Sequence, residues 1–302
     1  MTQKRYAGIE GGGTKFVCAI VDQDNQVLSE MRCPTTDPHT TLSACAEFLE
    51  EQQRALGPFE SLGIACFGPL DPTPGSPTYG NILPTPKPGW SGADVLGFFS
   101  RRLNLPIGFD TDVNGAALAE SLWGAGQGLT DLVYFTIGTG IGGGAIVGGK
   151  LLHGLLHPEM GHIPLPRDPE QDSFPGACPF HSDCFEGLAA GPALEKRWGQ
   201  RAETFTPDHP AWELEAHYIA LAMQSIICVL SPQRIILGGG VSSQPRLLPL
   251  VRQKTIAYLN GYVQSPAILE HMDEYIVPPG LGTRSGVLGA VALGRLALEV
   301  AL

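Results

Sequence analysis

Four side chains that can bind a metal gather in one short stretch of the sequence. His162, Cys178, His181 and Cys184 lie within it, and His157 could replace His162, because spacing alone does not choose between the two histidines. Two thiolates and two neutral imidazoles form a closed tetrahedral set that suits zinc. A catalytic zinc keeps a position open for water, so a full protein set indicates a structural site. The alternative is that the two cysteines are small buried side chains or a local disulfide.

Two carboxylates accompany the candidate metal ligands. Glu159 precedes His162, and Glu186 follows Cys184. If a metal fixes this loop, it fixes both carboxylates as well. Paired, immobile acceptors are what a polyhydroxyl ligand requires.

Two glycine turns each join two predicted strands. The first is Gly11, Gly12, Gly13, Thr14 and Lys15, between strands expected at 6–10 and 16–21. The second begins Gly138, Thr139, Gly140 and lies between strands expected at 132–137 and 145–147. A P-loop would continue into a helix, which neither turn does. Glycine nevertheless lets backbone amides approach a phosphate closely, and the repetition predicts a duplicated domain with both turns facing one cleft.

A third glycine turn follows the strand expected at 234–237. It consists of Gly238, Gly239 and Gly240 and precedes a helical segment. It could hold a nucleoside, or it could be an ordinary strand-to-helix connection.

A carboxylate ends another predicted strand. Asp112 follows the strand at 107–110 and precedes a helix expected at 116–123, with Asn114 as its predicted N-cap. Ligands of open α/β sheets bind at such strand ends, so Asp112 is a candidate general base. Asp110 is the rival, because in an extended segment the two side chains point the same way.

The remaining segments complete an α/β pattern. Helices are predicted at 38–56, 94–102, 188–199, 211–230 and after residue 286, with strands at 26–33, 62–66 and 275–277. The proline-rich stretch from Pro69 to Pro88 predicts a stiff loop that can wall a site.

Composition limits the classes of function. The chain has 302 residues, 43% hydrophobic and 16% charged, with a net charge of −11 and no basic run. Nucleic-acid binding needs clustered Lys and Arg, so it is not expected. Seven cysteines, without an apolar leader segment, predict a reducing cytoplasm. No apolar run approaches the roughly 18 residues that would span a bilayer.

These motifs together resemble the ROK family of sugar kinases, and within it the fructokinase branch. The resemblance implies an actin-like ATPase fold of two ribonuclease-H-like domains, residues 1–113 and 114–285, with the ligands in the cleft between them and the helix 286–302 packed back on the first. It implies a homodimer that phosphorylates D-fructose with ATP, Mg²⁺ and a structural Zn²⁺.

The resemblance also implies a role for each motif. Asp112 matches the catalytic base, and His162 matches a ligand of the zinc as well as a sugar contact. The expected ATP contacts are Gly11, Gly12, Gly13, Thr14, Lys15, Gly138, Thr139, Gly140, Pro192, Gly238, Gly239 and Gly240. The expected sugar contacts are Gly68, Lys87, Thr111, Asp112, Glu159, His162 and Glu186.

Three positions depart from the common family pattern. Glu10 stands where Asp is usual, His181 stands where a third zinc-loop cysteine is usual, and Lys87 replaces an asparagine of glucokinase-like members. The first glycine motif begins at residue 8, which leaves no room for the DNA-binding domain of regulatory members. A catalytically silent sugar sensor and a zinc-ribbon nucleic-acid binder are the alternatives from other classes.

Overall fold

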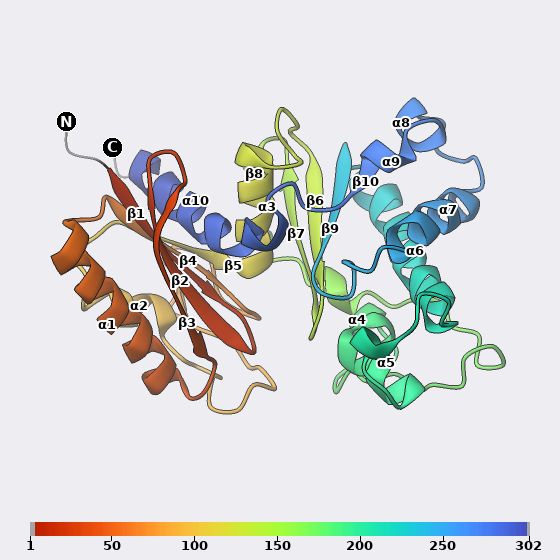
Figure 1. Ribbon diagram of the computed structural model, residues 1–302, viewed down its shortest axis with the longest axis horizontal. Helices are drawn as coiled ribbons and strands as arrows, with labels where there is room; N and C mark the ends of the chain where they lie inside the picture. The colour runs from red at the N-terminus through yellow and green to blue at the C-terminus, as the bar shows by residue number, and fades with distance from the viewer. Residues whose placement is uncertain (1–3, 301–302) are drawn as a thin grey trace. The chain divides into compact units, whose positions relative to one another are not determined.

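The computed structural model describes residues 4–300 and divides them into two compact units (Figure 1). Unit 1 holds the chain up to Gly124, the segment Leu151–Pro158 and the chain from Thr283 onward. Unit 2 holds Ala125–Lys150 and Glu159–Gly282. The boundary predicted after residue 113 falls inside a helix of unit 1.

Unit 1 is built on a five-stranded sheet with helices on both faces. Its order is β3-β2-β1-β4-β5, with β1/β2 and β2/β3 antiparallel and β1/β4 and β4/β5 parallel. The strands and helices are β1 (Arg5–Gly11), β2 (Lys15–Asp22), β3 (Val27–Pro34), β4 (Ser61–Cys66), β5 (Ile107–Thr111), α1 (Pro38–Leu56), α2 (Val95–Ser100), α3 (Asp112–Trp123) and α10 (Ser285–Val300).

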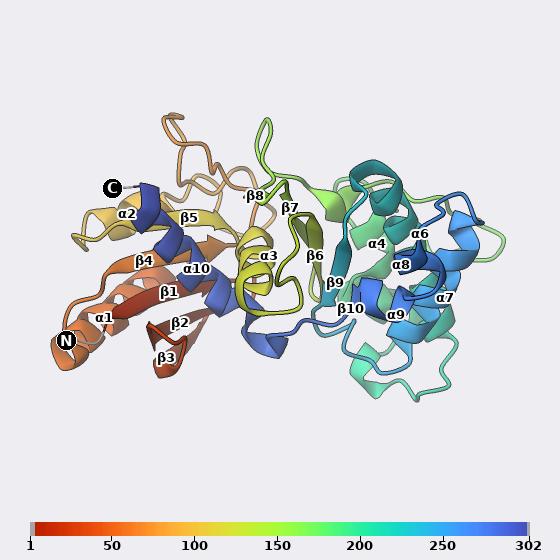
Figure 2. The same ribbon diagram turned by 90° about the horizontal axis from the view of Figure 1, so that it is seen from above.

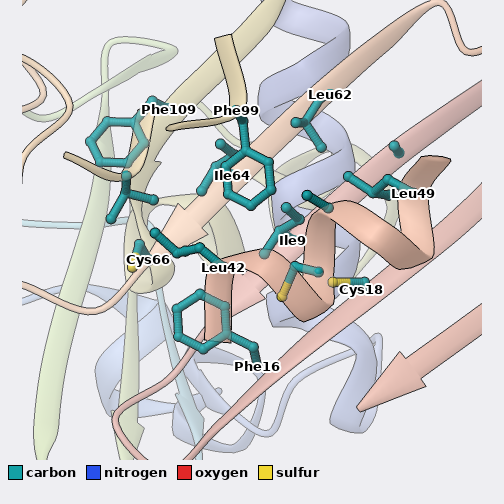
Figure 3. Close-up of a cluster of buried hydrophobic side chains, with 14 of the residues drawn as sticks. Ile9, Phe16, Cys18, Leu42, Leu49, Leu62, Ile64, Cys66, Phe99 and Phe109 are labelled. Atoms are coloured by element: carbon teal, nitrogen blue, oxygen red, sulfur yellow. The ribbon is translucent and has the colours of Figure 1, made fainter. Parts of the chain in front are cut away.

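Alternation along β2 explains how both faces of this sheet become buried. Phe16, Cys18 and Ile20 join the core beneath α1, whereas Val17 and Ala19 pack toward α10. Figure 3 shows the first face, where strand side chains meet Leu42 and Leu49 of α1. Because side chains alternate with a period of two, an uninterrupted apolar strand needs such a two-sided cover.

A row of glycines lets α10 pack directly on the backbone of the sheet. Gly8, Gly63 and Gly108 are in register across β1, β4 and β5. A Cβ on Gly63 would lie 1.6 Å from the Ala290 carbonyl oxygen, so no other residue fits there. Unlike the glycines of the predicted ligand-binding turns, the glycines of this row lie within strands and serve helix packing.

Unit 2 repeats the topology of unit 1. Its sheet order is β10-β9-β6-β7-β8, with β6 antiparallel to β7 and parallel to β9, and β9 parallel to β10. Taken from its other end, as β8-β7-β6-β9-β10, this order matches β3-β2-β1-β4-β5 of unit 1 strand for strand, as the duplication predicts. The strands are β6 (Leu132–Ile137), β7 (Ile141–Val147), β8 (Lys150–Leu151), β9 (Arg234–Gly238) and β10 (Ile276–Val277).

Helices gather on one side of the unit 2 sheet (Figures 1 and 2). They are α4 (Phe185–Ala189), α5 (Gly191–Trp198), α6 (Ala211–Leu230), α7 (Leu247–Leu259), α8 (Pro266–Leu269) and α9 (Met272–Tyr275). Short 3₁₀ turns occur at Met160–His162 (η1), Ala202–Thr204 (η2) and Gly282–Arg284 (η3). The helix predicted at 188–199 is thus two helices, α4 and α5.

Helix α6 corrects the expectation about long apolar runs. Among residues 4–300 it alone is long and apolar enough to cross a membrane by length and composition, and half of its most apolar window is buried. Trp212, Tyr218 and Met223 of α6 are almost fully buried. The helix is accounted for as the core helix of unit 2.

Candidate functional site

The four predicted metal ligands converge in unit 2. The ligand atoms of His162, Cys178, His181 and Cys184 all lie within 4.8 Å of one another. His162 ends η1, Cys184 immediately precedes α4, and Cys178 and His181 lie on the turn between them. His157 is elsewhere, in unit 1, where its Nε2 accepts a hydrogen bond from the Leu70 amide at 3.1 Å. The choice that spacing left open therefore falls on His162.

The separations among these atoms match a tetrahedral metal site. His162 Nδ1 lies 3.5 Å from Cys184 Sγ and 3.7 Å from Cys178 Sγ, and His181 Nδ1 lies 3.7 Å from Cys178 Sγ. Zinc bonds of about 2.3 Å to sulfur and 2.0 Å to nitrogen would place neighbouring ligand atoms about 3.5 Å apart. Burial raises the pKa of the Cys184 thiol to about 11, so a cation is needed to hold it as thiolate. Donor types and spacing both fit zinc.

Ionic contacts hold the loop between η1 and α4, residues 163–184, which we call the metal loop. Asp172 of this loop is buried and accepts a hydrogen bond from the Tyr218 hydroxyl at 2.6 Å. Arg197 Nη2 lies 3.2 Å from the same carboxylate, and Arg197 Nη1 donates to the Leu188 carbonyl. Arg167 donates to the carbonyls of Asp172 and Phe174. The metal loop is therefore fastened to α5 and α6 independently of the metal.

Glu186, in α4 just after the metal loop, contacts the residue that follows the second glycine turn. Its Oε2 accepts a hydrogen bond from the Ile141 amide at 2.9 Å. Gly161 of η1 also packs against this region, because a Cβ there would lie 1.8 Å from the Ile141 carbonyl oxygen. Glu159 precedes η1, and its carbonyl accepts from the His162 amide. The structure thus brings the predicted contacts Glu159, His162 and Glu186 beside the turn that starts at Gly138.

The second and third glycine turns of unit 2 lie at one edge of its sheet. Both follow parallel strands, β6 and β9, and the Val241 amide donates to the Ile137 carbonyl. Gly239 has φ +93°, a conformation that favours glycine. The Gly191 amide donates to the Gly138 carbonyl, which places Pro192 at the same edge. These are the positions expected to hold ATP.

In unit 1, the first glycine turn is held by its carbonyl groups. The carbonyl of Gly11 accepts from the Phe67 amide, and those of Gly12 and Thr14 accept from the Thr35 hydroxyl and amide. Lys87 Nζ donates to the Gly13 carbonyl at 2.7 Å. The Gly12 amide donates to the Lys15 carbonyl at 2.9 Å, and the remaining amides of such a turn can face an anion.

Three strand ends of unit 1 meet at the same sheet edge. Gly11, Cys66 and Thr111 are in register at the ends of the parallel strands β1, β4 and β5. The glycine turn, Gly68 and Asp112 follow these strands directly. Ligands of parallel α/β sheets bind at this edge.

The structure separates the two rival carboxylates. Asp110 is 3% exposed and accepts from the Thr111 amide, from Asn114 Nδ2 and from His153 Nε2. Asp112 is the first residue of α3, and its Oδ1 accepts from the Val113 amide. The predicted N-cap was wrong: Thr111 caps α3 by accepting from the Asn114 amide, and the helix begins at Asp112 rather than at 116.

The sequence matches a known protein family along almost its whole length. The model of the ROK family matches residues 6–296. The chain belongs to the ROK family. Among curated ROK relatives, the fructokinase of Zymomonas mobilis is 44% identical over 299 residues, which cover 98% of each chain.

Solved ROK structures confirm the predicted actin-like fold. The ROK hexokinase from Thermus thermophilus has a TM-score of 0.78 and 28% identity, and the match covers 98% of this chain and 99% of that one. A ROK glucokinase from Streptomyces griseus, in complex with glucose and AMPPNP, has a TM-score of 0.77 and 26% identity, with 97% and 99% coverage.

Several residues that shape this site belong to none of the motifs predicted from the sequence. His153 hydrogen-bonds the buried Asp110, Thr35 holds the first glycine turn, and Arg197 fastens the metal loop. Of these three residues, only Arg197 could have been suspected from the sequence, because it is a charged residue on a helix that must bury one face. His153 and Thr35 carry no motif, since their partners lie 43 and 23 residues away.

Proposed function

We propose that this chain is a fructokinase that transfers the γ-phosphoryl group of ATP to the 6-hydroxyl of D-fructose. The observation that carries the proposal is the 44% identity to the Zymomonas fructokinase over almost the whole chain. The placement of a carboxylate and a glycine turn at one sheet edge supports it. Glucokinase selectivity is the second candidate, but the Streptomyces griseus glucokinase is only 26% identical.

Asp112 is proposed to be the general base. As the sugar oxygen bonds to the γ-phosphorus and the bond to ADP breaks, the hydroxyl proton passes to the Asp112 carboxylate. Asp110 is unsuited to this role because three donors already occupy its carboxylate and it is buried.

The glycine turns are proposed to bind the phosphates. In each turn, backbone amides can face the negative oxygens, and Thr14, Lys15 and Thr139 add side-chain donors. Gly238, Gly239, Gly240 and Pro192 would hold the adenosine. Mg²⁺ would be bound together with the ATP phosphates and neutralise their charge. The Glu10 carboxylate lies close to Gly286 of α10, and burial raises its pKa, partly offset by Lys15.

The metal loop is proposed to order the sugar site. His162, Cys178, His181 and Cys184 would hold zinc, which supplies rigidity rather than chemistry. Glu159, His162 and Glu186, with Gly68 and Thr111 of unit 1, are the proposed sugar contacts. Fixed acceptors lower the entropy cost of orienting a flexible polyhydroxyl substrate.

A sugar panel tests the proposed substrate. With ATP and Mg²⁺, we expect the highest kcat/KM for D-fructose, with mannose and glucose weaker, and fructose 6-phosphate as product. The measurement is coupled ADP release, followed by identification of the product. A clear preference for glucose or N-acetylmannosamine would contradict the fructose assignment, and sugar binding without ADP release would identify a silent sensor.

Lys87→Met tests which substrate this side chain serves. Because its ammonium lies 2.7 Å from the Gly13 carbonyl, we expect it to act on the phosphate side. The variant should lose about tenfold in kcat, through weaker stabilisation of transition-state charge, with the KM for fructose changed little. The exposed Lys150→Met, on β8, is the matched control. A rise confined to the fructose KM would instead make Lys87 a sugar contact.

A further inference from the structure

A histidine outside every predicted motif contacts the strand that leads to Asp112. His153 lies on Leu151–Pro158, a short segment of unit 1 whose flanking residues on both sides belong to unit 2. Its Nε2 lies 2.7 Å from Asp110 Oδ2. The His153 side chain is 40% exposed, whereas that of Asp110 is 4% exposed. The pair therefore joins a solvent-accessible base to a buried carboxylate.

Asp110 also forms hydrogen bonds to residues at the start of α3. Its other oxygen, Oδ1, accepts from the Thr111 amide at 2.7 Å and from Asn114 Nδ2 at 3.0 Å. Thr111 in turn caps α3 through the Asn114 amide at 3.1 Å. Asp112 lies between these two residues, so the bonds of Asp110 bracket it on both sides.

The segment is also held at its other end. His157 Nε2 accepts from the Leu70 amide at 3.1 Å, and Leu70 lies just beyond Gly68. The two histidines thus fasten one segment to β5 and to the loop that follows β4. Asp112 directly follows β5, and the loop after β4 carries Gly68.

We propose that His153 is a positioning residue for the phosphoryl transfer: through Asp110 it fixes the first turn of α3 and so the direction of the Asp112 carboxylate. The inference rests on the proposed function and goes beyond it, because it adds a residue that does not touch either substrate. A misplacement of about 1 Å at a reacting group costs up to ~10²-fold in rate.

The charges around the pair are consistent with this role. Tyr79 interacts electrostatically with Asp110, and Cys66 interacts with Asp112; both neighbours are acids. His153, in contrast, can carry a positive charge. Its hydrogen bond to Asp110 raises the pKa of His153, although burial opposes the rise.

Two substitutions separate the hydrogen bond from the charge. His153→Gln keeps a donor that can reach Asp110 but is neutral, and His153→Ala removes both. For His153→Ala we expect kcat to fall about tenfold or more, with the KM for ATP within about twofold of wild type. For His153→Gln we expect a smaller loss of kcat. In both variants the acid limb of kcat/KM should move to higher pH, because loss of a nearby cation raises the pKa of a carboxylate.

Thermal unfolding measures the contribution of the His153–Asp110 pair to stability, independently of catalysis. The pKa of His153 is higher in the folded chain than the unfolded value of about 6.5. The pair's contribution to stability is therefore complete below about pH 6.5 and is lost as pH rises through the folded pKa. The Tm difference between wild type and His153→Gln should be larger at pH 6 than at pH 9.

His217→Gln is the control variant, and the activity of the wild type distinguishes failure of this inference from failure of the proposed function. His217 of unit 2 bonds the Tyr258 hydroxyl through Nδ1 at 2.6 Å, and His217→Gln should leave the acid limb in place. An active wild type whose acid limb and kcat are unchanged by His153→Gln and by His153→Ala overturns this inference alone. If His153→Ala does not fold, His153→Gln decides by its acid limb. A wild type inactive on every sugar overturns the proposed function and this inference with it.

Discussion

Asp112→Asn is expected to lower kcat on fructose by at least ~10²-fold, the lower end for a positioned general base. That loss corresponds to about 2.7 kcal/mol of transition-state stabilisation. The physical reason is that an amide cannot take the hydroxyl proton, whereas asparagine keeps the size of the side chain. It also keeps an oxygen that can accept from the Val113 amide, as Asp112 Oδ1 does at 3.0 Å. The measurement is steady-state turnover, with Tm and nucleotide affinity determined on the same samples.

Asp37→Asn is a suitable control for this substitution. Asp37 caps α1 by accepting from the Thr40 amide at 2.9 Å, so both changes replace a carboxylate at a helix start in unit 1. The control should keep wild-type kcat, and both variants should keep nearly the wild-type Tm. Near-normal kcat in Asp112→Asn would show that Asp112 is not the base.

Most elements of the fold could be predicted from the sequence, because the residues that mark them lie within or next to each element. Helices α1 and α6 and strand β6 occupy the residues that were predicted, since a proline near a helix start or a run of apolar residues marks them within a few positions. The duplicated topology followed from two matched glycine turns. The candidate metal ligands could be predicted because their side-chain types are rare and closely spaced.

What the sequence could not supply depends on contacts between distant residues. Gly63 lies within a predicted strand, but the need for glycine there becomes clear only when the carbonyl of Ala290 is seen against it. Asp110 and Asp112 cannot be told apart as residues of one strand. They separate only because α3 starts at Asp112 and because His153, 43 residues after Asp110, occupies the earlier carboxylate.

Cys184→Ser is expected to remove the metal and to disable the sugar site. One ligand of four would be lost, and weak serine ligation does not replace a thiolate in a closed zinc site. We expect about one zinc per chain in the wild type and far less in the variant, together with a lower Tm. The kcat/KM for fructose should fall at least ~10-fold, since even changes around metal ligands cost that much.

The loss should appear in sugar binding more than in nucleotide binding, because of what each element contacts. Glu186 lies two residues after Cys184 and reaches the Ile141 amide, so release of the metal frees a proposed sugar contact directly. The first glycine turn is held instead by Phe67, Thr35 and Lys87 of unit 1. The KM for fructose should therefore rise while the affinity of the first turn for phosphate is kept.

A second cysteine distinguishes metal loss from a general effect of removing a thiol. Cys228 is exposed near the end of α6, and Cys228→Ser should keep zinc, Tm and activity. Strong chelation of the wild type should reproduce the Cys184→Ser phenotype, and added zinc should reverse it. The contacts of Asp172 with Tyr218 and Arg197 do not involve the metal, so the metal loop should stay attached to α5 and α6 and the rest of unit 2 should remain folded. Active wild-type protein that contains no zinc would refute the metal assignment.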